Sequence, residues 1–348
     1  MLHRNLHMED IMNLKTSTGL RSGGVFGFLR SLNKALKQCP PDYYPVICWD
    51  SKVAQRRLDL YPNYKHNQER KRDSEFNEIS KLLLEDPNKV DIEKYTEEEV
   101  SIIKFKMNEM LSNKERFGSY SNPDDYLSVY VSQRNLIIDI CNSLGIPNLK
   151  YSCWEGDDLM TLLTRVSNKS IIVSDDSDMQ QLISADVSIL KVLKDTKFVK
   201  LDDVKALGYP NAHIIAVIKA ITGDGSDNIP QVVYRLGPKT AEKIALLMYK
   251  NNYDPLKYLE EISILLKGST IPKFIENHND FLRNLQLVDL TYVPDDFEVY
   301  NYISSIIKNA QVNYFDALAK ISKLEINAVD LESIINRCVM ARDKLYEV

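Results

Sequence analysis

Apolar residues recur at helical spacing in several stretches of the chain. Residues 25–36 carry valine, phenylalanine and leucine three to four positions apart, and residues 126–144 show the same pattern before Gly145. Positions three and four apart lie on one face of a helix, so each stretch predicts an amphipathic helix. Residues 211–221 and 241–249 are expected to be helical for the same reason.

Short runs of apolar, mostly β-branched residues predict buried strands. Residues 171–173 read Ile-Ile-Val, and residues 45–50 read Pro-Val-Ile-Cys-Trp-Asp. Further short strands are predicted at residues 187–193 and 197–199. The first two runs end in acidic residues, the first of them in residues 174–178. Acidic side chains are thus delivered to the carboxyl ends of strands, the edge at which open α/β sheets bind ligands.

Adjacent carboxylates repel each other unless a proton or a cation lies between them. The acids of residues 174–178 therefore indicate either a metal site or a solvated turn that ends in a helix cap. Residues 155–158 add three acids at the start of a predicted helix, where each is worth roughly 0.3–1 kcal/mol. Helix capping explains one or two of these acids. It does not explain all three, nor the three further acids that follow the next predicted strand, at residues 174–178.

Composition narrows the class of protein. The chain has 348 residues, 27% charged and 44% hydrophobic, which favours one large soluble domain with appendages. No apolar run approaches membrane-spanning length and the first ten residues lack a signal-peptide core, so a cytoplasmic protein without a membrane partner is expected. The five cysteines are widely spread without a CxxC pair, which argues for reduced thiols rather than a zinc knuckle or a disulfide framework.

The net charge of −5 argues against a nucleic-acid partner, but the charges are unevenly distributed. Lysine and arginine crowd residues 52–72, whereas residues 73–125 are strongly acidic with helical apolar spacing. Within the basic segment, Tyr61, Tyr64 and Lys65 alternate aromatic rings with a cation. This pattern suits a surface that stacks on bases and contacts phosphates, although a solvated amphipathic helix has the same appearance.

A second nucleic-acid feature is a glycine-bearing turn between two predicted helices. Gly237, Pro238 and Lys239 open the later helix, where backbone amides and a lysine can meet a phosphate. The turn is weak evidence alone, but it follows a further acidic motif at residues 223–228. The chain beyond residue 255 is helical without a catalytic signature.

Together these motifs resemble the 5'-to-3' exonuclease and flap endonuclease family, the type fused to bacterial DNA polymerase I and also encoded separately by bacteriophages. The resemblance runs from about residue 23 to about residue 290 and rests on ordered motifs. These are Tyr61-xx-Tyr64-Lys65, Glu155-Gly156-Asp157-Asp158-Leu159, Ser174-x-Asp176-x-Asp178-xx-Gln181-Leu182, Gly223-Asp224-x-Ser226-Asp227-Asn228-Ile229-Pro230 and Gly237-Pro238-Lys239-Thr240-Ala241.

The resemblance implies an α/β fold with a central, mostly parallel sheet of the PIN-like and flap-endonuclease-like type, flanked by helices. Residues 1–200 would form the nuclease domain, with a helical arch at about 52–72 and the acidic helical insert at about 73–125. Residues 201–295 would form a helix-three-turn-helix DNA-binding region, and residues 296–348 a C-terminal helical extension.

The resemblance also implies the chemistry. Two Mg²⁺ or Mn²⁺ ions, roughly 3.5–4 Å apart, would support in-line phosphodiester hydrolysis. Their expected ligands are Asp50, Glu155, Asp157, Asp158, Asp176, Asp178, Asp224 and Asp227. Lys65 and Arg70 are the expected catalytic cations. The expected DNA-binding residues are Arg57, Tyr64, Arg72, Gly237, Lys239 and Thr240.

The implied substrate is DNA with a 5' single-stranded flap or end, or an RNA–DNA hybrid during primer removal. Specificity would be for structure rather than sequence. A K⁺ ion at the helix-three-turn-helix turn, contacts with replication proteins and a monomeric state are further expectations. A phage-encoded protein of this kind would act in the host cytoplasm.

Three departures from the family pattern stand out. The family opens with a central strand ending in an aspartate, whereas Met1 to Arg4 already look like the following helix. Either the start is assigned at an internal methionine and an in-frame strand lies upstream, or this copy is degenerate. Gln68 replaces a frequent arginine, and Arg235 stands where the family has the first glycine of its turn, which bears on the K⁺ site.

Two competing functions follow. The missing aspartate motivates a catalytically impaired protein that binds DNA structures without cutting them. A related PIN-type ribonuclease shares acidic sheet edges, but such domains are smaller and lack the helix-three-turn-helix turn.

Overall fold

A computed structural model describes residues 11, 14–51, 53–65, 123–193, 195–327 and 329–345, with the side chains of residues 123–130 and 343–345 left undescribed. Several sequence predictions lie outside these ranges, among them the opening residues, Gln68 and the acidic insert up to residue 122. In the described part of the chain, no helix combines the length and the apolar character that crossing a membrane requires.

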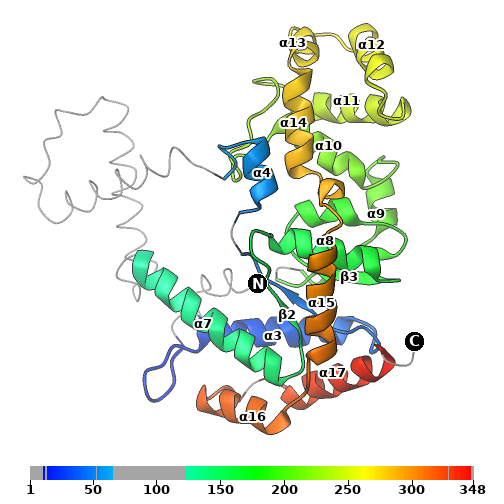
Figure 1. Ribbon diagram of the computed structural model, residues 1–348. Coiled ribbons are helices and arrows are strands. Elements are labelled where there is room, and N and C mark those ends of the chain that lie inside the picture. Colours follow the sequence, from blue (N-terminus) through cyan, green and yellow to red (C-terminus); the bar gives the residue numbers. More distant parts are fainter. Residues whose placement is uncertain are drawn as a thin grey trace, which may run out of the picture.

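The described residues are mostly helical, with short strands between the helices (Figure 1). The strands are β1 (Ile47–Cys48), β2 (Asn148–Leu149), β3 (Ser170–Val173), β4 (Val187–Lys191) and β5 (Lys197–Val199). The α-helices are α3 (Gly23–Gln38), α4 (Gln55–Leu60), α7 (Pro123–Ser143), α8 (Gly156–Val166), α9 (Leu201–Ala206), α10 (His213–Thr222), α11 (Pro238–Lys250), α12 (Pro255–Leu265), α13 (Thr270–Glu276), α14 (His278–Val288), α15 (Phe297–Asn309), α16 (Tyr314–Lys323) and α17 (Leu331–Leu345). Two 3-10 helices are η3 (Asp178–Leu182) and η4 (Leu290–Tyr292).

The helices predicted from the apolar periodicity are confirmed by α3, α7, α10 and α11. Helix α7 ends before Gly145, whose φ of +73° favours a residue without a Cβ atom. The C-terminal helices α16 and α17 share one core with α3 and α7. Ile321 of α16 and Ile334 and Cys338 of α17 belong to the same buried cluster as Val25 and Phe28 of α3. These last helices therefore pack into the core around α3 (Figure 1).

The strands differ from the expected single sheet. Strand β1 pairs in parallel with β2, while β3 pairs in parallel with β4 and β4 pairs antiparallel with β5. The described strands thus form two separate sheets, one of two strands and one of three. The parallel character was predicted correctly, but the continuous central sheet is not present in the described part of the chain. Among the described strands, only β4 is paired on both edges.

Another core lies among α10 to α14, at one end of the molecule (Figure 1). Ile214, Val217 and Ile221 on one face of α10 are fully buried and meet Ile244 and Phe281 from neighbouring helices. Helix α10 packs against both α11 and α14. This arrangement rigidly holds the residues between α10 and α11, which carry the third acidic motif and the glycine-bearing turn.

Candidate active site

The start of α8 holds several acids in a fixed arrangement. Glu155 is the N-cap residue, and a reciprocal capping box joins it to Asp158, whose carboxylate accepts the backbone N–H of Glu155 at 3.2 Å. The backbone N–H of Gly156 donates to Asp50 Oδ1 at 2.7 Å. The acid that ends β1 therefore docks on the positive end of this helix, close to the acids of the first turn.

Arg57 of α4 neutralises this acidic group from inside the protein. Its side chain is 3% exposed, and its guanidinium lies 3.0 Å from Glu155 Oε2 and 2.9 Å from Asp158 Oδ1. It also donates from Nε to the backbone oxygen of Leu287 at 3.1 Å. Burial would lower the pKa of Arg57, but attraction by the surrounding carboxylates raises it overall, so the side chain stays charged. Arg56 forms a second ion pair with Asp158.

These positions differ from the roles expected for Arg57 and Tyr64. The guanidinium of Arg57 is 3% exposed and held by Asp158 and Glu155 in this structure, and its role in steering a single-stranded DNA end stays a prediction. The ring of Tyr64 is also 3% exposed, so it is not available to stack on a nucleotide in this structure. Both side chains instead belong to the internal support of the acidic cluster.

Lys65 joins the acidic motif at residues 155–158 to the acidic motif at residues 223–228. Its Nζ lies 2.7 Å from Glu155 Oε2 and 3.9 Å from Asp227 Oδ1. Its backbone N–H donates to the carbonyl oxygen of Asp227 at 2.8 Å. The hydroxyl of Tyr64 donates to Asp227 Oδ2 at 3.2 Å, which fixes the same carboxylate from another side. The segment after α4 is therefore tied to both acidic motifs.

Lys219 forms the matching contact on the other side of the site, and the sequence analysis missed it. Its Nζ contacts the carboxylate of Asp178 and lies 2.6 Å from Asp224 Oδ2. Asp224 is further held by the backbone N–H and the hydroxyl of Ser226, at 2.8 and 2.6 Å. The signal available in the sequence was a lysine in the last turn of a helix, just before an acidic motif.

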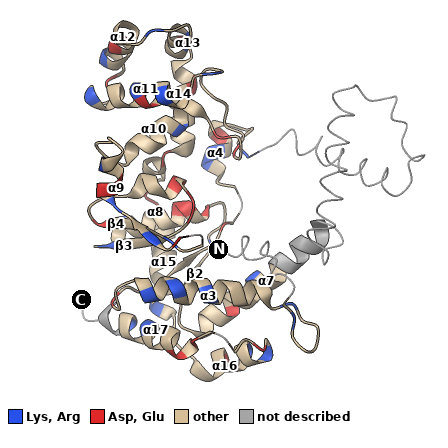
Figure 2. Ribbon diagram, turned by 180° about the vertical axis from the view of Figure 1, so that it is seen from behind, with Lys and Arg blue, Asp and Glu red and all other residues tan. Residues whose placement is uncertain are grey.

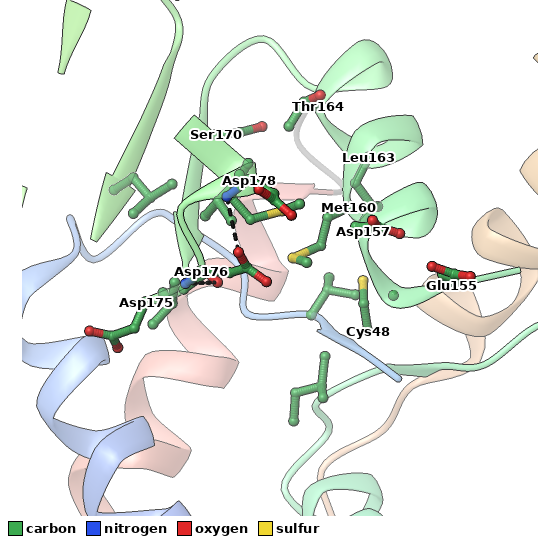
Figure 3. Close-up of a pocket in the computed structure, with 18 of the residues that line it drawn as sticks. Cys48, Glu155, Asp157, Met160, Leu163, Thr164, Ser170, Asp175, Asp176 and Asp178 are labelled. Atoms are coloured by element: carbon green, nitrogen blue, oxygen red, sulfur yellow. Dashed lines mark hydrogen bonds between the residues drawn. The ribbon is translucent and has the colours of Figure 1, made fainter. Parts of the chain in front are cut away.

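The three acids after β3 are not equivalent. Asp176 Oδ1 accepts the backbone N–H of Asp178 at 2.9 Å, and both side chains line the central cavity. Asp175 instead points away from this pair (Figure 3) and accepts the N–H of Leu193 at 3.4 Å. All three acids line the cavity, but the Asp175 carboxylate accepts from the backbone of Leu193, whereas Asp176 and Asp178 are linked to each other.

The electrostatics show an excess of negative charge. Burial raises the pKa of Asp157 to about 7, aided by Asp158 and Glu155 and opposed by Arg57. Burial also raises the pKa of Asp227, whereas Arg57 and Lys65 outweigh burial and hold the pKa of Glu155 below its usual value. A carboxyl whose pKa is raised binds a proton or another cation readily.

The predicted ligands meet in one cavity of about 2030 Å³. Its lining includes predicted ligands from four segments of the chain together with the two lysines that contact them. These residues are Asp50, Lys65, Glu155, Asp157, Asp176, Asp178, Lys219, Asp224 and Asp227. Asp158 is absent from the lining because its carboxylate is fully buried against Arg56 and Arg57. Figure 2 shows the acidic start of α8 next to α4.

The donor set suits a hard divalent cation, because it consists of carboxylate oxygens. Within the described ranges, no three His, Cys, Asp or Glu side chains approach one another closely enough to hold an ion. Two pairs nevertheless bracket a positive charge, since Lys65 lies between Glu155 and Asp227, and Lys219 contacts both Asp178 and Asp224. Each ammonium group stands where a cation shared by the pair would lie.

The glycine-bearing turn opens α11 with Gly237 as the N-cap residue and a proline at the first helical position. Lys239 and Thr240 follow in its first turn, and Lys239 is exposed. Arg235 adopts a left-handed conformation with φ of +65°, which is the conformation that a glycine would favour there. Its guanidinium lies over the ring of Tyr234, which is 78% exposed. This end of the molecule therefore presents cations and an aromatic ring to solvent.

Two expected site residues, Arg70 and Arg72, lie outside the described residues. Their roles as a catalytic cation and a DNA contact stay predictions from the sequence.

The fold and the acidic cavity define a class that comparisons with known proteins identify. Residues 121–207 match the family described as "5'-3' exonuclease, N-terminal resolvase-like domain". The chain is 23% identical to a 5'-3' exonuclease of Aquifex aeolicus over 318 residues, which cover 90% of this chain and 82% of that protein. A 5'-3' exonuclease of Bacillus subtilis is 26% identical over 275 residues, covering 77% of this chain and 69% of that protein.

A DNA polymerase I of Rhizobium leguminosarum is 26% identical over 165 residues, and the match covers 46% of this chain but only 15% of the polymerase. Among solved structures, the T5 5'-exonuclease with bound zinc has a TM-score of 0.54 at 20% identity, covering 88% of this chain and 97% of that chain. The bacteriophage T5 flap endonuclease in complex with DNA and metal ions has a TM-score of 0.51 at 18% identity, covering 98% and 97%. At these identities the structural similarity concerns the fold.

These similarities support the 5'-3' exonuclease and flap endonuclease family for the chain, with a relation to the N-terminal part of DNA polymerase I.

Proposed function

We propose that the chain is a structure-specific 5' nuclease that hydrolyses phosphodiester bonds in DNA carrying a 5' single-stranded flap or end. This proposal rests on one observation: acids from four segments of the chain line one cavity. Within it, Lys65 and Lys219 each contact a pair of carboxylates. So many carboxylates in one place require cations. We also propose that the same site can remove RNA primers, and that the protein acts as a monomer.

Two divalent ions, Mg²⁺ or Mn²⁺, are the proposed cofactor. The residues that would hold them are the acids lining the cavity, namely Asp50, Glu155, Asp157, Asp176, Asp178, Asp224 and Asp227. When bound, such ions lower the pKa of a water and offset the charge on the leaving oxygen. Asp158 contributes indirectly, because its ion pairs with Arg56 and Arg57 hold the start of α8 in place.

The two lysines have proposed roles of their own. Both ammonium groups are partly exposed, at 31% for Lys65 and 19% for Lys219, so each can reach a ligand in the cavity. Lys65 would offer its charge to the phosphate at which negative charge develops. Lys219 would hold Asp178 and Asp224 at a fixed separation until a cation binds there. Arg70 remains a second proposed cation at the scissile phosphate.

The start of α11 is the proposed site for duplex DNA. The positive end of α11 at Gly237 to Thr240 can attract a phosphate there, and Lys239 adds a point charge. Such contacts position a duplex without reading its sequence. Arg235 adopts the left-handed conformation that a glycine would favour at this position, so the backbone of the turn is kept. A K⁺ ion bound by the backbone of this turn is part of the proposal.

A second candidate function is a DNA-structure-binding protein with impaired catalysis. It is favoured by the grouping of acids in the described residues, where pairs are bridged by lysines and no group of three is close enough to hold an ion. Such a protein would use the surface at Gly237 to Thr240 and leave the phosphodiester bond intact.

One experiment separates the two functions. A labelled 5'-flap duplex is incubated with the protein and Mg²⁺, and with EDTA in a parallel sample. Cleavage that EDTA stops supports the nuclease, whereas retention of the flap substrate without any product supports the binding protein.

A matched set of variants tests the site. Asp176→Ala is expected to abolish cleavage and leave flap binding intact, while Asp175→Ala keeps both, because Asp175 is turned toward Leu193. Lys65→Ala is expected to slow cleavage by orders of magnitude without an equal loss of affinity. Equal losses of cleavage and affinity for Lys65→Ala would make this lysine a phosphate anchor only.

A further inference from the structure

Helix α14 lies beside both α4 and α10 (Figure 1), and it contacts each of them. Phe281, Leu285 and Val288 on this helix are buried in the core that also contains Ile214 of α10. Apolar packing therefore fixes the helix in place. Its last two turns, residues 282–288, also make polar contacts with three segments of the chain that carry or support acids of the cavity.

The first of these contacts is made by Asn284, whose side chain is fully buried. Its Nδ2 donates to the carbonyl oxygen of Ala220 at 3.0 Å and to that of Pro230 at 2.8 Å. Its Oδ1 accepts from the guanidinium of Arg283 at 3.0 Å. Both N–H donors of the amide are thus used, and their acceptors stand on either side of the loop at residues 223–229.

This loop carries Asp224 and Asp227, and its own backbone is tightly closed. Asp224 and Ile229 exchange two backbone hydrogen bonds of 2.8 Å each. A Cβ atom on Gly223 would lie only 2.6 Å from the carbonyl oxygen of Ile229, so the neck of the loop has no spare room. Because the loop is closed in this way, its direction relative to the cavity depends on what holds its base. Asn284 holds that base from both sides.

The second contact is made by Gln181 of η3, the 3-10 helix that begins at Asp178. The last carbonyl groups of an α-helix lack partners within the helix. That of Val288 accepts from Gln181 Nε2 at 3.1 Å, and Gln181 Oε1 accepts the backbone N–H of Leu290 at 2.8 Å. The side chain of Gln181 therefore joins the end of α14 to the element that presents Asp178.

The third contact is made by Arg57, whose Nε donates to the carbonyl oxygen of Leu287 at 3.1 Å. The same guanidinium pairs with Glu155 and Asp158 at the start of α8. The C-terminal end of a helix carries a partial negative charge, which favours a cation there. Helix α14 thus supports the acids at residues 155–158 through this arginine.

We propose that α14 is the common support of the acids in the cavity, with Asn284 and Gln181 as positioning residues. Asn284 would set the place of Asp224 and Asp227, and Gln181 that of Asp178. Neither side chain lines the cavity, so neither can touch a substrate there. The inference rests on the proposed function, because it concerns how these acids bind divalent cations. Loss of a group that orients metal ligands typically weakens metal binding by roughly 10- to 100-fold.

Isothermal titration calorimetry of the full chain with MgCl₂, in the absence of DNA, tests the proposal. Asn284→Leu keeps a similar side-chain size but has no N–H donors, so the carbonyl oxygens of Ala220 and Pro230 lose this partner. The dissociation constant for Mg²⁺ is expected to rise by roughly 10- to 100-fold. Gln181→Leu should raise it about tenfold. Affinity for an uncleaved 5'-flap duplex in EDTA should remain that of the parent protein in both variants.

Two control variants on the same helix separate positioning from general stability. Gln286→Leu makes the same change from amide to apolar side chain at an exposed position and should leave Mg²⁺ affinity unchanged. Leu285→Ala weakens the core without removing a hydrogen bond to the loop, so it should lower the urea midpoint but not the Mg²⁺ affinity of the folded protein. Asn284→Ser keeps at most one donor and should give a smaller rise than Asn284→Leu. Gln181 is only half-buried, so Gln181→Leu provides the test even if the Asn284 variants do not fold.

Parental Mg²⁺ affinity in the folded positioning variants would overturn the proposal. An equal loss of Mg²⁺ affinity in Leu285→Ala and Asn284→Leu would also overturn it, because stability alone would then account for the effect. A parent protein that binds Mg²⁺ but does not cleave the flap would contradict the nuclease function only. A raised dissociation constant in Asn284→Leu would support the positioning role in that case as well.

Discussion

Replacing Arg57 with alanine tests the internal support of the acidic cluster. The guanidinium is 3% exposed and contacts Glu155, which is 6% exposed, and Asp158, which is 1% exposed. Removing one partner of a buried ion pair leaves the other charge uncompensated and costs about 3–5 kcal/mol. The lost hydrogen bond to the backbone of Leu287 places the expected value toward the upper end.

The assay is urea unfolding followed by circular dichroism. With an m-value of about 3 kcal/mol per molar urea, the expected loss moves the midpoint down by about 1–1.5 M. Arg56→Ala is the matched control, because its side chain is 28% exposed and it pairs with Asp158 alone, so its effect should be clearly smaller. In a double-mutant cycle, Arg57→Ala and Asp158→Ala should couple by at least about 2 kcal/mol.

The reasoning is refuted if Arg57→Ala unfolds within about 1 kcal/mol of the parent protein. It is also refuted if Arg57→Ala and Arg56→Ala have equal effects, since the ion pairs of the two residues differ in burial and number. A stable Arg57→Ala variant with weakened DNA binding would return Arg57 to the role of a DNA contact.

Other predictions concern single side chains. Lys219→Met is expected to bind Mg²⁺ about tenfold more tightly than the parent, as measured by calorimetry, because the lysine competes for Asp178 and Asp224; unchanged affinity would remove it from the cation site. Burial lowers the pKa of His278 below its usual 6.5. The neutral side chain therefore stabilises the fold fully above pH 6.5, and this stabilisation is lost as the pH falls through the lower pKa of the folded state. Urea unfolding at pH 7.5 and 5.5 should therefore show a smaller acid loss in His278→Gln, and equal losses would exclude this contribution. Gly156→Ala should lower the unfolding midpoint, because the added Cβ would lie 3.1 Å from Asp50 Oδ1, and a midpoint equal to that of the parent would show that the Asp50 contact can shift freely.

The sequence predicted the local elements well for a physical reason. Helices α3 and α7 carry their apolar residues at the spacing that one buried face requires, and this information is contained within each segment. The acids that follow β1 and β3 and those that begin α8 line one cavity, and their roles as metal ligands stay predictions.

The side-chain roles within the cluster could not be read in the same way. Arg57 stands in a run of basic residues that resembles an exposed surface, and α4 has only six residues, too few to show which face is buried. Lys219 is one lysine at the end of an apolar helix, and its contact with Asp178 depends on the packing of α10 against η3. Both assignments require the tertiary arrangement.

The expected single sheet illustrates a different limit. The pattern of the strands correctly predicted parallel pairing, but pairing partners are long-range information. The structure shows that the edge peptide groups of Cys48, Ile171 and Val173 have no partner strand among the described residues. The described strands therefore do not form the continuous sheet that was expected.

The proposed function assigns DNA cleavage, with the help of divalent cations, to the acids of this cavity. The most direct measurement follows a 5'-labelled flap duplex with the parent protein and with Asp176→Ala, in Mg²⁺ and in EDTA, together with the affinity of both proteins for the uncleaved flap. The account predicts cleavage only by the parent protein and only with Mg²⁺, at equal affinities. Cleavage by Asp176→Ala at the parent rate, or binding without cleavage by the parent protein in Mg²⁺, would contradict it.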